Sequence, residues 1–111
     1  MYNEHKLDEL LLELGHNDFN RGTAMLRTAV RDYRPGIYIT KELYPGVAAY
    51  HGTTPARVER NIRHSIESAW NRSTFDVQTK YFGNSVDPNK GAPTVGEYVA
   101  RLARIVHEAD V

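Results

Sequence analysis

Hydrophobic side chains recur at helical spacing along most of the chain, most clearly in the stretch at residues 54–70, TPARVERNIRHSIESAW. At 100° per residue, its apolar positions fall on one side of a helix. These positions are Val58, Ile62, Ser65, Ile66 and Ala69, with Trp70 at their edge. Thr54 suits the N-cap, and Pro55 suits the first helical position, where no backbone donor is needed. The pattern predicts a helix of about five turns with one buried side.

Three earlier segments carry helical signals. Leucines at i, i+3, i+4 and i+7, followed by Gly15 as the expected stop, predict a first helix: Leu7, Leu10, Leu11 and Leu14. A second helix, ended by Pro35 and Gly36, is marked by Phe19, Leu26, Ala29, Val30 and Tyr33. Residues 39–52 predict a third element capped by Thr40. A kink or restart is expected at Pro45, because proline clashes inside a continuous helix.

The C-terminal third predicts two further helices. Ser73 or Thr74 begins a short apolar segment that Gly83 stops, and residues 84–93 have the composition of a loop. Thr94 and Glu97 have the spacing of a capping box. The stripe that follows is Val95, Tyr98, Val99, Leu102, Ile105 and Val106. Because no segment alternates as a strand does, we expect an all-α fold of about six helices.

Composition limits the partners that the chain can have. A length of 111 residues predicts a single domain. Fourteen basic and fourteen acidic residues give a formal net charge of zero, which weighs against holding nucleic acid by bulk charge alone. The charge is uneven, however, because residues 57–72 contain four arginines and two glutamates. The lack of cysteine, of a signal peptide and of a long apolar run predicts a cytoplasmic protein without a membrane partner.

The polar side of residues 54–70 is a candidate DNA-reading surface. It carries Arg57, Arg60 and His64, flanked by Arg63 and Asn61. A short helix, a turn containing glycine and then a longer helix with an arginine-rich side form the layout of a helix-turn-helix. The planar fork of arginine can bond guanine O6 and N7 together. The same residues would also suit a solvated helix surface, and this alternative stays open.

Other residues near this surface have two interpretations each. Glu59 can accept a hydrogen bond from cytosine N4 or orient Arg63, and a simple ion pair with Arg63 is the competing interpretation. Phosphate contacts, which fix register, are expected from Lys41, Thr53, Thr54, Asn61 and Lys90. The threonines also suit capping. A solvated lysine is the alternative for Lys90.

Catalytic and cofactor chemistry is not expected. The five histidines are scattered, with neither an HExxH pair nor a cysteine beside them, so no metal site is expected. The sequence contains no glycine-rich loop for nucleotide phosphates and no nucleophile elbow around a serine. We therefore expect a protein that is not an enzyme, with no catalytic residue and no cofactor.

Residues 57–70, RVERNIRHSIESAW, resemble the recognition helix in the effector domain of the stage-zero sporulation response regulator family. ITKELYP before them, and FG at 82–83 and APTVGEYVA at 92–100 after them, agree in order and spacing from about residue 7 to residue 106. The resemblance implies a sequence-specific transcription regulator that reads double-stranded DNA at a box close to TGTCGAA. It implies base reading by Glu59, Arg60 and Arg63, with Arg57 and His64 at the same surface.

The resemblance also implies partners. In the family, the stretch matching residues 71–82 includes a surface that touches the sigma subunit of RNA polymerase. Here that location holds Ser73, Thr74 and Phe75, which differ from the family's usual residues, so only the location is carried over. The family effector binds as a head-to-tail pair on tandem boxes through its C-terminal helix, and we expect a monomer in free solution.

Two questions of organisation stay open at this stage. Full-length family members carry an N-terminal receiver domain, and these 111 residues contain nothing like it. We therefore expect either an excised effector domain or a stand-alone relative. The alternative function is a helical protein-interaction adaptor that keeps the fold without specific DNA binding, which the zero net charge favours.

Overall fold

The computed structural model describes residues 2–17, 20–87 and 89–108, and all regular structure within them is helical. The α-helices are α1 (Glu4–Glu13), α2 (Arg21–Asp32), α3 (Tyr44–His51), α4 (Pro55–Arg72), α5 (Phe75–Phe82) and α6 (Val95–Glu108). A π-helical stretch, η1 (Ile39–Leu43), precedes α3, and a 3₁₀ turn, η2 (Gly83–Ser85), follows α5. The expected all-α fold of about six helices is confirmed. Phe19, assigned to the second helix from sequence, lies outside the described residues.

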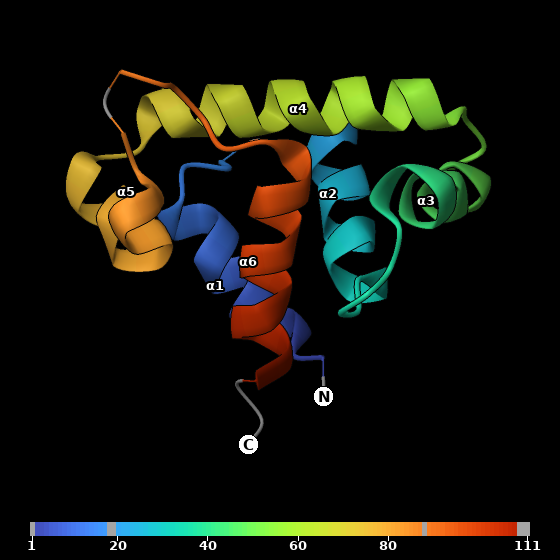
Figure 1. The fold of residues 1–111 in the computed structure, drawn as a ribbon, viewed down its shortest axis with the longest axis horizontal. Helices are drawn as coiled ribbons and strands as arrows, with labels where there is room; N and C mark the ends of the chain where they lie inside the picture. Colours follow the sequence, from blue (N-terminus) through green and yellow to red (C-terminus); the bar gives the residue numbers. More distant parts are fainter. Residues whose placement is uncertain (1, 18–19, 88, 109–111) are drawn as a thin grey trace.

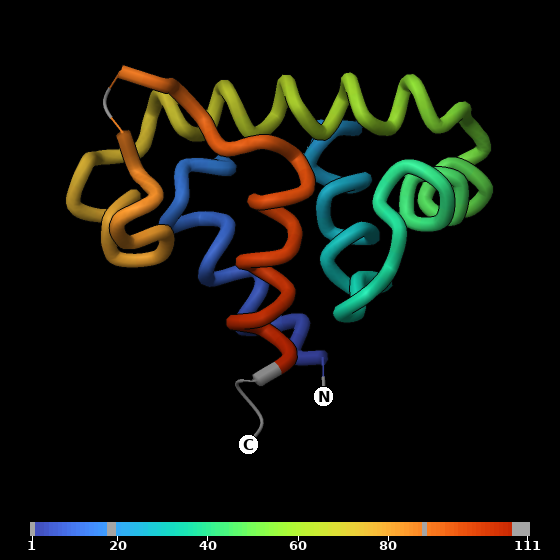
Figure 2. The backbone as a smooth tube through the Cα atoms, viewed as in Figure 1, coloured from blue at the N-terminus to red at the C-terminus, as the bar shows by residue number. Residues whose placement is uncertain are grey.

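The helices are arranged beneath one long helix. Figure 1 shows α4 lying across one end of the molecule, with α2 and α6 running away from it. The α3 helix lies at the N-terminal end of α4, and α5 lies at its C-terminal end. The backbone trace in Figure 2 shows that the start of α1 and the end of α6 lie at the opposite end of the molecule from α4. One side of α4 is therefore covered by the fold and the other is not.

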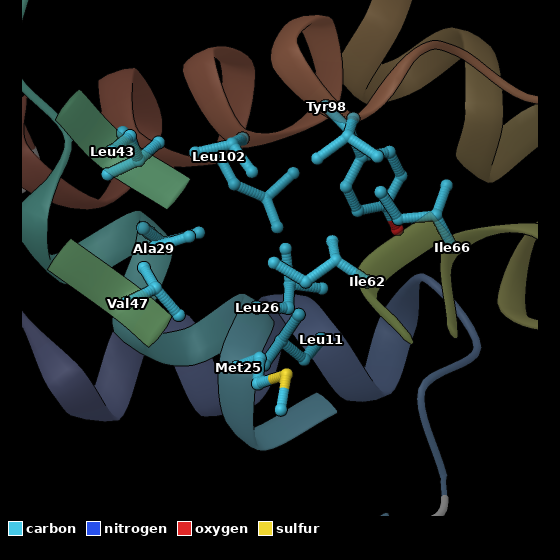
Figure 3. Packing of buried hydrophobic residues seen from close by; sticks show 14 of the residues in the cluster. Leu11, Met25, Leu26, Ala29, Leu43, Val47, Ile62, Ile66, Tyr98 and Leu102 are labelled. Atoms are coloured by element: carbon cyan, nitrogen blue, oxygen red, sulfur yellow. The ribbon is translucent and has the colours of Figure 1, made fainter. Parts of the chain in front are cut away.

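The covered side of α4 supplies the centre of the core. Its buried residues are Val58, Ile62, Ser65, Ile66, Ala69 and Trp70, as the sequence pattern predicted. Figure 3 shows Ile62 and Ile66 pointing toward Leu26 of α2 and toward Tyr98 and Leu102 of α6. All five of these side chains are at most 1% exposed. The amphipathic pattern of one helix thus decides how α2 and α6 are placed.

Two glycines let the chain approach the backbone of α4 closely. Gly15, which ends α1 as expected, has a φ of +99°, and a Cβ there would lie 2.6 Å from the Ala69 carbonyl oxygen. A Cβ on Gly22 of α2 would lie 2.4 Å from the Asn61 carbonyl oxygen. Any side chain at either position would therefore push α4 away from α1 and α2.

A buried chain of polar groups crosses the core. The hydroxyl of Thr23 lies 3.0 Å from the Ser65 hydroxyl, which lies 3.2 Å from His16 Nδ1. His16 Nε2 lies 2.8 Å from the Tyr98 hydroxyl. Each of these polar groups thereby has a hydrogen-bond partner that replaces the water lost on burial. The series of hydrogen bonds joins α2, α4 and α6. Burial also raises the pKa of the Tyr98 phenol, so it stays protonated.

The segment before α3 differs from its prediction in one detail. The expected restart at Pro45 is confirmed, since α3 carries this proline in its first turn. Thr40, however, is not a cap: it lies inside η1, and Tyr38 occupies the N-cap position. The backbone N–H of Tyr38 donates to Glu42 Oε1 at 3.0 Å. The N–H groups of Glu42 and Leu43, which a capping threonine at position 40 would have bonded, instead donate to the Tyr38 carbonyl at 2.9 Å and 3.0 Å.

The predicted ends of α5 and α6 are confirmed. Thr74 caps α5 by accepting from the Val77 N–H at 3.2 Å, and Gly83 ends this helix with a φ of +57°. The capping box is reciprocal: the Thr94 N–H donates to Glu97 Oε1 at 3.1 Å, and the Glu97 N–H donates to the Thr94 hydroxyl at 3.2 Å. Hydrogen bonds from Thr94 lower the pKa of Glu97.

The two sides of α4 should respond differently to truncation. Ile62 is 0% exposed, so Ile62→Ala should reduce the free energy of unfolding by about 2–5 kcal/mol through lost burial and a residual cavity. Arg63→Ala removes only an exposed side chain and should cost about 0.5 kcal/mol or less. Urea denaturation followed by circular dichroism measures both. Similar losses in the two variants would contradict the assignment of the buried side.

Candidate nucleic-acid interface

The turn between α3 and α4 is built by a glycine and two threonines. Gly52 follows α3 with a φ of +65°, a left-handed conformation that favours glycine. The Thr53 N–H then donates to the Ala48 carbonyl at 2.9 Å, which closes the turn. Thr54 begins α4 by accepting the Arg57 N–H at 3.3 Å. These local contacts produce the helix-turn-helix layout that the sequence predicted.

The solvent side of α4 carries the candidate base-reading residues. Arg57, Arg60, Arg63 and His64 are exposed and Glu59 is half-buried; we call these five residues the arginine face. Because the other helices lie on the opposite side of α4, the arginine face points away from the body of the molecule (Figure 1). The structure therefore places these residues, which were predicted from their spacing and from the family resemblance, on one accessible surface.

Glu59 and Arg63 form an ion pair within the arginine face. Arg63 Nε donates to both carboxylate oxygens of Glu59, at 3.3 Å and 3.1 Å. The two side chains are 46% and 37% exposed for Arg63 and Glu59, so the pair contributes about 0.5 kcal/mol or less to stability. The geometry fits both the ion-pair interpretation and the interpretation in which Glu59 orients Arg63.

The other two arginines of this face are available for a partner. Within the described part of the chain, the guanidinium groups of Arg57 and Arg60 form no ion pair or hydrogen bond. With Arg63, they place three guanidinium groups on a side of α4 that also carries two carboxylates, those of Glu59 and Glu67, in a chain whose net charge is zero. The arginine face is therefore a local positive surface.

The predicted phosphate-contacting residues lie on three separate elements. Thr54 is exposed at the start of α4, and Asn61 is half-buried on that helix. Lys41 is exposed on η1, and Lys90 is exposed in the loop before α6. Thr53 differs from these, because its hydroxyl oxygen is buried and has no hydrogen-bond partner. In this conformation a phosphate contact from the Thr53 hydroxyl would require rotation of the side chain.

The predicted sigma-contact region forms the start of α5. Ser73 donates to the Trp70 carbonyl at 2.9 Å, and Thr74 caps α5, so both side chains have structural partners. Phe75 is 56% exposed, which leaves its ring accessible. On the other side of α5, Lys80 Nζ lies 2.9 Å from a carboxylate oxygen of Glu13, which ties α5 to α1. The hydrogen bonds that Tyr81 and Lys80 donate lower the pKa of Glu13.

One contact that positions α3 relative to α2 was not predicted from the sequence. The Thr28 hydroxyl lies 2.8 Å from His51 Nε2, across the junction between the two helices. The residues are 23 positions apart, and neither stands in a recognisable local motif. Since His51 is the last residue of α3, this contact helps fix the turn that leads into the arginine face.

Metal-binding clusters and membrane-spanning helices are both absent from the described residues. No group of three or more histidine, aspartate or glutamate side chains there is placed to hold a metal ion. No helix in the described ranges is both long enough and apolar enough to cross a membrane.

Comparison with known protein families gives a match over nearly the whole chain. The sequence profile of the family described as "Sporulation initiation factor Spo0A C terminal" matches residues 7–106. The matched range contains the turn, all of α4 and most of α6, and leaves only eleven residues of the chain outside it. The resemblance inferred from the helix motif and its flanking segments is thereby confirmed.

The N-cap at the start of the arginine face can be tested on its own. Thr54→Ala removes the acceptor of the Arg57 N–H and should lower the free energy of unfolding by about 1 kcal/mol. Thr54→Ser keeps a hydroxyl at the same place and serves as the matched control, with a loss well below that of alanine. Chemical denaturation of the three proteins measures the difference. Wild-type stability in Thr54→Ala would show that the cap contributes nothing.

Proposed function

The chain belongs to the family of sporulation initiation factor Spo0A C-terminal domains, which are DNA-binding effector domains of a response regulator, and we propose that its arginine face reads a short DNA box. The observation that carries this proposal is the exposure of three arginines on the helix that follows the helix-turn-helix turn. A single α-helix fits the major groove of B-form DNA, where each base pair presents its own pattern of donors and acceptors.

The length and spacing of the arginine face suit a short box. Arg57, Arg60 and Arg63 follow one another at three-residue intervals, so they span about 9 Å along the axis of α4. That distance corresponds to about three base-pair steps. The proposed target is a sequence close to TGTCGAA, which rests on the family resemblance.

Each residue of the arginine face has a proposed role. The unpaired guanidinium groups of Arg57 and Arg60 are suited to guanine O6 and N7. Glu59 either accepts from cytosine N4 or holds Arg63 in position, for which the observed pair provides the geometry. His64 lies two turns beyond Arg57 on the same exposed side. These roles make base reading depend on α4 alone.

Phosphate contacts would fix the register of α4 in the groove. Lys41 on η1 and Lys90 before α6 are exposed cations, and Thr54 and Asn61 lie on α4 itself. Thr53 would make a fifth phosphate contact if its side chain rotated to expose the buried hydroxyl. Such contacts are independent of sequence and weaken as salt concentration rises.

A contact with the sigma subunit of RNA polymerase is proposed for the start of α5. Support comes from the exposure of Phe75, whose ring offers apolar area at the end of α4 opposite the turn. Ser73 and Thr74 belong to the proposed contact region because their hydrogen bonds fix the turn between α4 and α5. Their side chains are already engaged in those bonds.

Substitution of Arg60 and Lys41 separates base reading from phosphate binding. Arg60→Ala should cost about 1–3 kcal/mol on a duplex with the proposed box and should relax the preference at one guanine. Lys41→Ala should weaken binding to box and scrambled duplexes by similar factors. Fluorescence anisotropy with both duplexes, at two salt concentrations, gives the four affinities that are needed.

The same titrations test the proposal as a whole. If Arg60→Ala lowers the affinity for the box duplex and for the scrambled duplex equally, Arg60 does not read a base. If the wild-type protein shows no preference for the box at micromolar concentration, the result supports the alternative of a helical protein-interaction adaptor.

We further propose that two copies bind head to tail on tandem boxes. One α4 reads too little sequence to select a site among the competitors in a genome, and pairing multiplies the specificity. Within the described residues, the large exposed hydrophobic side chains lie on separate segments, which supports a monomer in free solution. They are Leu12, Tyr38, Tyr50 and Phe75.

The pairing proposal predicts cooperativity that depends on DNA. Light scattering should give the monomer mass for the free chain, and a two-box duplex should fill with higher apparent affinity per site than a one-box duplex. The coupling should be small, because it comes from a limited contact near α6 and the segment after α4. A stable dimer without DNA, or independent filling of the two boxes, would count against the pair.

A further inference from the structure

A large open groove runs beside α6, away from the arginine face. Its volume is about 1070 Å³, and it extends from Trp70 to His107. We call it the α6 groove. Its walls come from four parts of the chain: residues 33–35 after α2, Trp70 of α4, residues 82, 85–86 and 90–94, and α6 itself. The apolar lining includes Trp70, Phe82, Val86, Ala92, Ala100 and Ala103. A hollow of this size and composition is suited to a ligand with an apolar body.

The polar lining of the α6 groove is strongly positive. Among the described residues that line it, Glu97 is the one carboxylate and four side chains are cationic: Arg34, Lys90, Arg101 and Arg104. Glu97 is already engaged by Thr94 in the capping box. Within the described part of the chain, the side chains of Arg34 and Arg101 have no hydrogen bond or ion pair. Two arginines without a carboxylate partner among the described residues favour an anionic occupant.

DNA bound to the arginine face does not account for this charge. Trp70 belongs to the covered side of α4, and α6 runs from there to the far end of the molecule (Figure 1). Arg34, Arg101 and Arg104 therefore line a surface on the body of the domain, whereas the arginine face lies on the outer side of α4. Only Lys90 belongs both to this groove and to the set of proposed phosphate contacts.

We propose that the α6 groove binds a small organic anion, with an aromatic or hydrocarbon body and a carboxylate, sulfonate or phosphate group. The apolar lining would exclude water from the body of the ligand. The forks of Arg34 and Arg101 would bind its oxygen atoms, since guanidinium matches a planar or tetrahedral oxyanion with paired N–H donors. The groove volume of about 1070 Å³ lies just above the range for pockets that hold drug-sized ligands, about 300–1,000 Å³, so a ligand of that size fits with room for water.

The probe for this proposal is 1-anilinonaphthalene-8-sulfonate, an aromatic anion. Trp70 is the chain's single tryptophan and lines the groove, so its fluorescence should be quenched by energy transfer to the bound probe. The neutral analogue N-phenyl-1-naphthylamine has the same rings without the sulfonate. Titration should show one saturable site for the anion. The neutral analogue should bind roughly tenfold more weakly, as expected for the loss of two partly exposed charge contacts.

Two variants locate the site. Arg34→Gln combined with Arg101→Gln should weaken anion binding roughly five- to tenfold and leave the neutral analogue almost unaffected. Arg21→Gln, which removes an exposed cation of α2 outside the groove, is the matched control and should bind as wild type. Ala100→Phe places a large side chain in the groove from the half-buried side of α6 and should weaken the binding of both probes. Circular dichroism melts establish that each variant is folded.

Several results would overturn the proposal. Equal affinity for the charged and neutral probes, or unchanged anion binding in the double variant, would show that the arginines do not recognise the anion. Displacement of the probe by a one-box duplex would assign these cations to DNA. Displacement on raising the protein concentration would assign the groove to a second copy of the chain. Unchanged binding of the anionic probe in the presence of the one-box duplex and at high protein concentration supports a site separate from both.

Discussion

Burial of one side of α4 is the constraint on which the rest of the structure depends. Ile62 and Ile66 fill the space between α2 and α6, and Trp70 continues the buried side toward α5. Full burial of a side chain of this size contributes about 1.5–3 kcal/mol, so these contacts are a large share of what a domain of this length has to stabilise it. Because this side of α4 is fixed inward, the arginine face is necessarily fixed outward.

Close approach and polar bonding make that arrangement specific. Gly15 and Gly22 bring the neighbouring segments against carbonyl groups of α4, where any side chain would clash. The chain of hydrogen bonds through Ser65, His16 and Tyr98 then fixes how α4 is rotated, since each group would be left buried and unpaired in another register. Packing energy and orientation thus come from different residues of the same helix.

Features set by neighbouring residues were predictable from sequence. The sides of α4, the caps at Thr54 and Thr94 and the stop at Gly15 depend on residues within a few positions, and the structure confirms them. The cap at Thr40 was wrong because the helical structure already begins at Ile39, so that the Tyr38 carbonyl accepts the N–H groups of Glu42 and Leu43.

Features that depend on distant residues were not predictable. The Tyr98 hydroxyl contacts His16, which lies 82 positions away in the sequence, and no local pattern in either segment predicts this contact. The candidate DNA surface was accessible to sequence reasoning because one helix carries all the residues proposed to read bases. The α6 groove was not, because its cations come from three segments that only the fold brings together.

The central claim is that one helix builds the core with one side and reads DNA with the other. Titration of ¹⁵N-labelled protein with a one-box duplex, followed by amide chemical shifts, tests it most directly. The account predicts that the largest changes fall on the turn at Thr53 and Thr54 and on Arg57, Arg60 and His64, with small changes at Ile62 and Ile66. Changes concentrated on α5 and α6, with α4 unaffected, would contradict it.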